Sequence, residues 1–207
     1  MKKLMLVAVF AGLGLSVLAG PPKKIVKAVA GSFTVDAPKS SFKWNAKKVV
    51  GEHSGTAGFQ GGSISINANK LVGADITIDM ASIDCSDLTG EYHDKLVGHL
   101  KADDFFATDK FNTAKIKIKS ATEIKGAAAG SNNYNVVADL TIKGITKEVS
   151  FPAFVVINPN QVIANAELDV DRTAFEIKYG SASFFEGLGD KAIANTFNVK
   201  VRIVANK

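Results

Sequence analysis

Apolar and polar residues alternate one by one along most of the chain from residue 33 onward. A period of two is typical of a β-strand with one apolar and one polar face. Turn-forming residues such as Gly61-Gly62 and Asn158-Pro159-Asn160 separate the alternating segments. Alternation with short connections favours antiparallel strands over the fully buried strands of a parallel sheet. The pattern predicts at least eight strands, whose apolar positions lie within residues 33–35, 42–46, 64–66, 74–80, 114–118, 136–142, 149–151, 162–170 and 197–203.

The period changes between Asp87 and Phe106. There, apolar residues recur at helical spacing, and Asp87 is placed to cap the first turn. Glycines at 90 and 98 weaken a helix, so one to three short turns are expected near residues 87–101. The last apolar side chains of this segment could pack across an open end of a barrel, although ordinary core packing would explain them equally well: Leu96, Leu100, Phe105 and Phe106.

The first residues have the pattern of a secretory signal. Lys2 and Lys3 precede an apolar run over residues 4–18, and Val17-Leu18-Ala19 places small residues where a signal peptidase cleaves. The run is shorter than the ~20 residues that span a bilayer, so a retained membrane anchor is the weaker alternative. We expect a signal peptide over 1–19, a mobile segment over 20–32, one domain over 33–207, and a periplasmic or secreted protein.

Charge and cysteine content narrow the classes of partner and of chemistry. The formal net charge is +5, and basic residues such as Lys115, Lys117 and Lys119 alternate with apolar ones instead of clustering with aromatic residues. This is typical of a solvated strand face and gives no reason to expect a nucleic-acid partner. Cys85 is the only cysteine, so no intramolecular disulfide is possible. Its acidic neighbours would raise the pKa of the thiol, which favours a small buried or half-buried side chain over a nucleophile.

No catalytic arrangement emerges from the motifs. The histidines are His53, His93 and His99, and the last two are six residues apart, which puts them on different sides of a helix. A metal-dependent or acid-base enzyme that uses these histidines is retained as an alternative. Asp171 and Arg172 are interpreted as a structural ion pair. No catalytic residue, metal or cofactor is therefore predicted.

Small side chains recur on the predicted inner face of the strands. Interiors are packed to near crystal density, so a row of alanines must meet large partners or border a cavity. Eight strands enclose just enough room for one slender ligand. Both a tapered solid core and a hollow barrel remain open for these positions: Ala46, Ala74, Ala114, Ala138, Ala164 and Ala166.

Several longer motifs are shared with a known family. They are Gly51-Glu52-His53-Ser54-Gly55, residues 74–80 with Ser82-Ile83, Gly98-His99-Leu100-Lys101-Ala102-Asp103-Asp104-Phe105-Phe106, residues 140–149, Asp171-Arg172-Thr173-Ala174-Phe175 and Tyr179-Gly180-Ser181. Together they resemble the YceI-like family of secreted polyisoprenoid-binding proteins over about residues 33–204. Residues 92–98 stand where many members have Arg-Asp before the His-Leu pair, and residues 184–191 look like those of a subgroup. The head-group end of a ligand therefore stays open.

The resemblance implies a single all-β, antiparallel, eight-stranded or slightly larger lipocalin-like barrel. Its tunnel would hold a long-chain isoprenoid or fatty-acyl lipid without catalysis. A homodimer is possible because exposed phenylalanine pairs need cover. The alternative from another class is an interaction protein with a solid barrel that acts through the loops around Phe184 and Phe185. The residues expected to line the tunnel are Phe42, Trp44, Ile76, Ile78, Met80, Leu96, Leu100, Phe105, Phe106, Ile116, Ile118, Ala138, Leu140, Ala164, Ala166, Leu168, Phe197 and Val199.

Overall fold

The structure, a computed structural model, describes residues 28–207. The predicted signal peptide over 1–19 and the first part of the predicted 20–32 segment lie outside the described residues. The first strand begins at Gly31, two residues before the start expected for the domain. The elements are β1 (Gly31–Val35), η1 (Ala37–Lys39), β2 (Ser41–Lys48), β3 (Glu52–Asn67), β4 (Lys70–Cys85), α1 (Gly90–Lys101), β5 (Thr113–Glu123), β6 (Tyr134–Ile142), β7 (Ile145–Ile157), β8 (Gln161–Asp171), η2 (Arg172–Phe175), η3 (Gly189–Lys191) and β9 (Ile193–Asn206).

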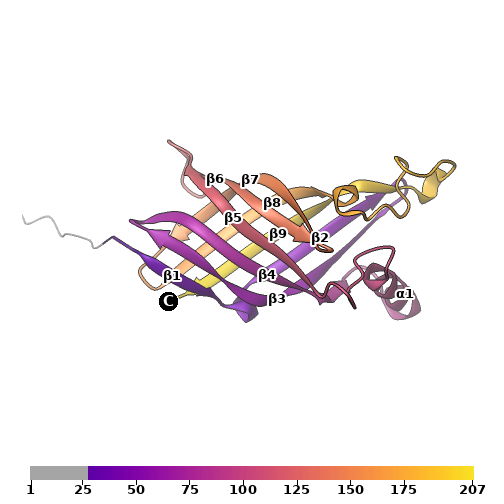
Figure 1. The fold of residues 1–207 in the computed structure, drawn as a ribbon, viewed down its shortest axis with the longest axis horizontal. Helices are drawn as coiled ribbons and strands as arrows, with labels where there is room; N and C mark the ends of the chain where they lie inside the picture. The colour runs from indigo at the N-terminus through magenta and orange to yellow at the C-terminus, as the bar shows by residue number, and fades with distance from the viewer. Residues whose placement is uncertain (1–27) are drawn as a thin grey trace, which may run out of the picture.

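The strands form one closed antiparallel barrel (Figure 1). From β4 to β9 each strand pairs with the next in the chain; β9 then pairs with β2, β2 with β3, and β3 with β4, which closes the wall. Strand β1 pairs with the C-terminal parts of β3 and β9, at residues 63–66 and 205–206. Strands β1 and β2 therefore both lie between β3 and β9, one after the other along the barrel. The prediction of an antiparallel barrel of eight or slightly more strands with one helical insertion is confirmed.

Local sequence sets the corners of the barrel. Two hairpins turn through two residues that both have positive φ, Ala68-Asn69 between β3 and β4 and Lys143-Gly144 between β6 and β7. This backbone matches the right-handed twist of paired strands. Gly62 of β3 has a φ of +143°, and a Cβ there would lie 2.4 Å from the carbonyl oxygen of Asp75. Only glycine permits this close approach of β3 to β4.

The core has two parts that follow one another along the barrel. The terminal-end cluster lies where β1 begins and the chain ends, and the helix-end cluster lies where α1 covers the barrel (Figure 1). Leu71, Tyr134 and Val162 are buried in the first cluster, and Trp44, Phe106 and Ile177 in the second. The apolar faces that the alternation predicts therefore meet inside one barrel.

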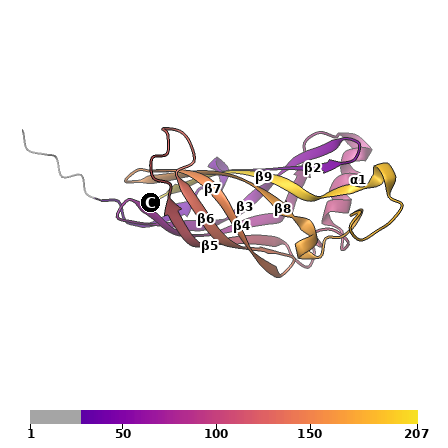
Figure 2. The same ribbon diagram turned by 90° about the horizontal axis from the view of Figure 1, so that it is seen from above.

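Helix α1 and the segment between β8 and β9 cover the same end of the barrel (Figure 2). The rings of His99 in α1 and Tyr179 in that segment meet edge to face, with centroids 4.4 Å apart. The helix begins at Gly90, with Thr89 at its N-cap, so the prediction that Asp87 caps it is wrong. The Asp87 carboxylate instead accepts hydrogen bonds from β3. Within residues 28–207, no helix has the length and apolar character needed to cross a bilayer.

Candidate functional site

The barrel encloses an apolar cavity of about 170 Å³. Residues from β2 through β9 line it, and Arg172 brings a charged side chain to the wall. Asn165 also borders the space, but it alternates with Ala164 and Ala166 and pairs with the exposed Arg202, so its side chain lies on the outer face. An apolar cavity of about 150 Å³ stays dry and takes up benzene, so this interior has room for an apolar ligand. The lining runs from Leu71 and Val155 beside the terminal-end cluster to Leu100 and Phe105 under the helix. The space is therefore elongated along the barrel.

Small side chains leave this space unfilled. Ala153 of β7 and Ala166 of β8 are directly opposite each other across the two strands, and both line the cavity. Neither side chain is long enough to reach the opposite wall. Ala46, Ala74 and Ala114 also line the cavity, as the hollow interpretation of the alanine row requires.

Sixteen of the eighteen residues expected to line a tunnel lie on the cavity wall. Ala138 and Leu96 do not, and their placement corrects the prediction. Ala138 is 0% exposed, because larger neighbours on β5 and β7, including Ile118 and Val149, cover its short side chain. Leu96 packs against the helix-end cluster one turn before Leu100, too early in α1 to reach the cavity. Those on the wall are Phe42, Trp44, Ile76, Ile78, Met80, Leu100, Phe105, Phe106, Ile116, Ile118, Leu140, Ala164, Ala166, Leu168, Phe197 and Val199.

Aromatic rings close the cavity at the helix end. Phe105 and Phe106 meet edge to face at 5.2 Å, and Phe106 meets Phe197 of β9 at 6.3 Å. The His99 ring lies against Phe105 at 5.5 Å. The predicted hydrophobic cover is thus built from the loop after α1 and from β9, with Leu100 as the residue of α1 that lines the cavity.

Gly55 brings Trp44 against the wall beside this cover. A Cβ at Gly55 would lie 1.9 Å from the carbonyl oxygen of Asp84 and 2.5 Å from the Trp44 ring, so no larger residue fits. The indole Nε1 donates a hydrogen bond of 3.2 Å to the same Asp84 oxygen. Gly55 of the Gly51–Gly55 motif therefore lets the indole approach the backbone of β3 closely.

Arg172 is the charged residue of the cavity lining, and it is 2% exposed. Its guanidinium donates to four backbone carbonyls, those of Ile177, Tyr179, Ile193 and Ala194. The predicted ion pair with Asp171 is wrong, since that carboxylate accepts from Thr173 instead. Desolvation on burial lowers the pKa of Arg172 below its ordinary value. The attraction of Asp171 acts in the opposite direction but is the smaller effect.

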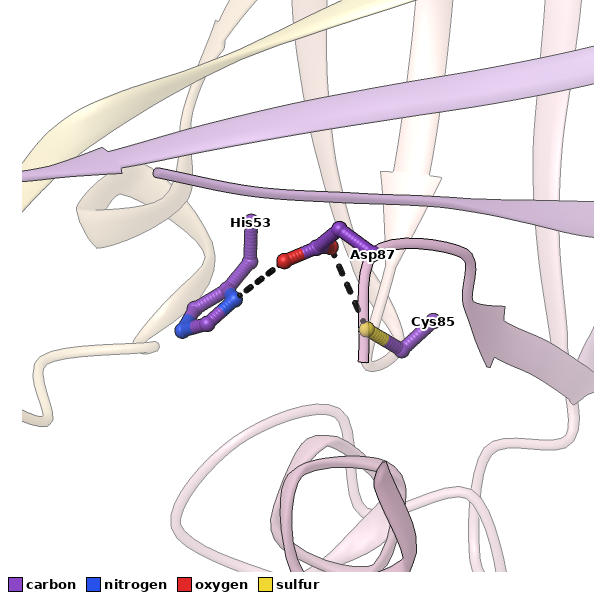
Figure 3. Close-up of side chains that lie close together, drawn as sticks. All are labelled: His53, Cys85 and Asp87. Atoms are coloured by element: carbon purple, nitrogen blue, oxygen red, sulfur yellow. Dashed lines mark hydrogen bonds and ion pairs between the residues drawn. The ribbon is translucent and has the colours of Figure 1, made fainter. Parts of the chain in front are cut away.

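A polar cluster of His53, Cys85 and Asp87 lies beside the helix end (Figure 3). Asp87 Oδ2 is 2.8 Å from His53 Nδ1, and Asp87 Oδ1 accepts from the Ser54 amide at 2.7 Å and the Cys85 thiol at 3.3 Å. Burial raises the pKa of the thiol, as does the nearby carboxylate. Desolvation raises the pKa of Asp87, but hydrogen bonds from Ser54, His53 and Cys85 outweigh it and lower that pKa overall.

Imidazole, thiolate and carboxylate are all ligands that Zn²⁺ accepts, but here the three side chains are joined to one another by hydrogen bonds. Among residues 28–207 it is the one group of three potential ligands close enough for a metal ion. Its atoms are close because the carboxylate already bonds both neighbours, and a thiol with a raised pKa is a poor ligand. The cluster joins β3 to the segment that leads into α1.

The other histidines are held by their own carboxylates. His93 Nε2 lies 2.8 Å from Asp84 and its Nδ1 2.9 Å from Asp94, while His99 Nε2 lies 3.3 Å from Asp104. The histidines are absent from the cavity wall. The structure thus does not bring His53, His93 and His99 into one site.

The sequence-family model of the YceI-like domain matches residues 33–205 of the chain. The chain belongs to the YceI-like family. UPF0312 proteins of Staphylococcus aureus, for example that of strain N315, are 49% identical to it over 53 residues, which are 26% of this chain and 25% of theirs. The match therefore spans about a quarter of the length of these curated relatives.

Solved structures share the barrel of this YceI-like protein. BcnA of Burkholderia cenocepacia has a TM-score of 0.62 and 25% identity, over 83% of this chain and 99% of its own. A polyisoprenoid-binding domain of Saccharophagus degradans has a TM-score of 0.60 and 16% identity, over 87% of this chain and 99% of its own. The YceI protein of Campylobacter jejuni has a TM-score of 0.52 and 15% identity, over 93% and 94%.

Two pairs of phenylalanines differ sharply in this YceI-like barrel. Phe105 and Phe106 are buried, whereas Phe184 and Phe185, on the segment before β9, are 48% and 50% exposed. A partner could cover the exposed pair, so the homodimer and the interaction through these loops both stay predictions. The solid barrel of that alternative is not observed, because the cavity occupies the middle.

Of the 36 residues that line the cavity, 20 are absent from the predicted list. Phe59 lies between two irregularities in the pairing of β3 with β4, and the surrounding glycines hide the alternation there. Phe151 lies on the apolar face predicted for residues 149–151 but is not among the residues predicted for the wall, and Val155 continues the same period of two further along β7. No local signal marks Arg172 as part of the wall, since its partners come from segments that follow it in the chain.

Proposed function

We propose that this YceI-like protein binds a long-chain isoprenoid or another long-chain lipid in the barrel cavity. It sequesters or carries the lipid outside the cytoplasm, without catalysis. The observation that carries the proposal is the elongated cavity with its almost wholly apolar wall. The likeness to a polyisoprenoid-binding domain supports the same class of ligand.

Hydrophobic burial alone would give useful affinity. At about 0.8 kcal/mol for each buried methylene, ten methylenes would contribute roughly 8 kcal/mol before the cost of ordering the chain. The width and length of the cavity would set the selectivity for the hydrocarbon part. The wall offers many such contacts, including Ile78, Ile116 and Leu168.

Absence of catalysis and the location outside the cytoplasm belong to the proposal. The first is supported by the position of the histidines, which bond aspartates away from the cavity wall. The second is supported by the charged and apolar pattern of residues 2–19. Sequencing the N-terminus of the protein recovered from outside the cytoplasm tests it: a start after Ala19 is expected.

Ala166→Phe tests the cavity directly. The new ring enters the cavity beside Ala153, so we expect loss of bound lipid from the natively purified protein, measured by organic extraction and mass spectrometry. Glu167→Phe is the matched control, because Glu167 is exposed on the outer face of the same strand. It should retain its lipid. Circular dichroism must show a folded barrel in both variants.

Unchanged lipid content in folded Ala166→Phe would contradict the assignment of the cavity. Extraction of the unsubstituted protein without any lipid, together with failure to take up added long-chain lipid, would contradict the proposed function itself.

A further inference from the structure

Arg172 places an unpaired positive charge in an otherwise apolar cavity. It is the first residue of η2, just after β8 ends, and it is 2% exposed. The other polar residue that borders the cavity, Asn165, pairs with the exposed Arg202, so its side chain lies on the outer face of β8. A buried cation is costly unless a counter-ion or equivalent partners surround it. The partners of Arg172 therefore decide what this end of the cavity can hold.

Backbone carbonyls occupy four of its five N–H donors. Nε donates to Ala194 O at 2.9 Å, Nη2 to Ile193 O at 3.1 Å, and Nη1 to Ile177 O at 2.7 Å and Tyr179 O at 2.8 Å. A guanidinium has five N–H groups, and two of them belong to Nη2. One N–H of Nη2 thus has no acceptor among residues 28–207.

Among the described residues no carboxylate contacts the guanidinium, although Asp171 attracts it without touching it. Asp171, its neighbour in the chain, is exposed, and its Oδ1 accepts from both the amide and the hydroxyl of Thr173. The face of the Phe105 ring lies 5.9 Å from the guanidinium carbon and gives a weaker attraction. The carbonyls satisfy donors but are neutral as groups. A net positive charge remains at the helix end of the apolar space.

We propose that Arg172 anchors the head group of the ligand and selects amphiphiles with a singly charged oxyanion, of which a carboxylate is the simplest. The hydrocarbon chain then runs from Arg172 along the cavity toward the terminal-end cluster. A single remaining N–H fits one oxygen of a carboxylate, whereas the two-pronged recognition that arginine gives phosphate needs two free donors. This inference rests on the proposed function and adds the chemistry of the head group.

Ligands that share one chain and differ in the head group test the inference on the unsubstituted protein. Palmitic acid, methyl palmitate, palmityl alcohol and palmityl phosphate would each compete with a bound fluorescent long-chain probe. The acid is expected to bind about 10-fold more tightly than the ester and the alcohol, which is about 1.4 kcal/mol. Equal affinities for all four would overturn the inference and leave the proposed function intact. Tighter binding of the phosphate would overturn the choice of a single charge.

Arg172→Gln assigns the preference to the residue. The chain has a second arginine, Arg202, on the exposed face of β9, so Arg202→Gln is the matched control. Arg172→Gln should bind the acid no better than the ester, and Arg202→Gln should keep the preference. A folded Arg172→Gln that still prefers the acid would overturn the assignment.

Arg172→Lys provides a second test in case Arg172→Gln does not fold. It keeps the positive charge but has three N–H donors instead of five. It should keep part of the preference for the acid, and a folded Arg172→Lys without any preference would count against the anchor. Failure of the unsubstituted protein to bind any of the four ligands or the probe would instead overturn the proposed function.

Discussion

The two ends of the barrel are closed in different ways. At the terminal end the strands pack directly on one another, and Phe33, Val162 and Ala205 are each 0% exposed. The Tyr134 hydroxyl accepts a hydrogen bond from the Leu71 amide there, so the polar atom of that ring is also satisfied. At the helix end, α1 and the segment before β9 lie over the opening and touch through ring edges.

This difference indicates which end can open. Separating the packed strands would break backbone hydrogen bonds and expose core residues together, whereas parting α1 from the segment before β9 breaks the ring contact between His99 and Tyr179. Exposed aromatic residues also gather on the cover, at Tyr92, Tyr179, Phe184 and Phe185. We therefore expect the terminal end to hold the fold and the helix end to admit the ligand.

The largest expected effect separates the two ends by stability. Phe33→Ala should lower the free energy of unfolding by about 3–5 kcal/mol, because it leaves a hole in a filled core. Phe197→Ala should cost less than about 3 kcal/mol, since its ring already borders the cavity and loses fewer contacts. Urea unfolding followed by circular dichroism measures both.

A milder pair, Phe33→Leu and Phe197→Leu, keeps the comparison measurable if Phe33→Ala does not fold. The same order is expected. Equal losses at the two positions would mean that the terminal end is no better packed than the cavity wall.

Most of the wall could be predicted from the sequence because of strand geometry. Successive side chains of a strand point to opposite faces, so the apolar set of a one-sided barrel is its inner set. Ile76, Ile78 and Met80, or Phe197 and Val199, follow from this rule without knowledge of the pairing. Ala138 obeys it too, but whether a side chain reaches the cavity depends on the size of its neighbours on other strands.

Contacts that depend on the tertiary fold could not be predicted. Asp87 has the local features of a helix cap, but His53 and Ser54, more than thirty residues earlier, take its carboxylate. Arg172 next to Asp171 suggests an ion pair, whereas β9 and the segment after η2 supply carbonyls that bind it more completely. Sequence neighbours therefore gave the wrong partner in both cases.

A smaller effect concerns exchange through the helix end. Tyr179→Ala removes the ring that meets His99 at 4.4 Å but keeps the carbonyl that accepts from Arg172. An edge-to-face pair contributes about 0.5–1.5 kcal/mol, so release of a bound fluorescent fatty acid should become about 2- to 10-fold faster in stopped-flow displacement. Val72→Ala changes an exposed residue of β4 at the terminal end, so it is the control and should leave the rate unchanged. An unaltered rate in Tyr179→Ala would argue against entry at this end.

The smallest effect is a pH response confined to the helix end. The pKa of His93 is raised, first by its hydrogen bond with Asp94 and then by that with Asp84. The protonated imidazole is thus favoured in the folded state, so its contribution to stability is fully present below the unfolded pKa of about 6.5 and is lost as the pH rises through the folded pKa. In an NMR titration the His93 midpoint should lie above about 6.5, and Asp94→Asn should lower it more than Asp84→Asn.

The chain has three histidines, and all lie in or next to β3 and α1 at the helix end, so amide shifts at the terminal end should stay constant between about pH 5 and 8. Shifts of Leu71 or Tyr134 in that range would show that the two ends respond together, against the division drawn between them.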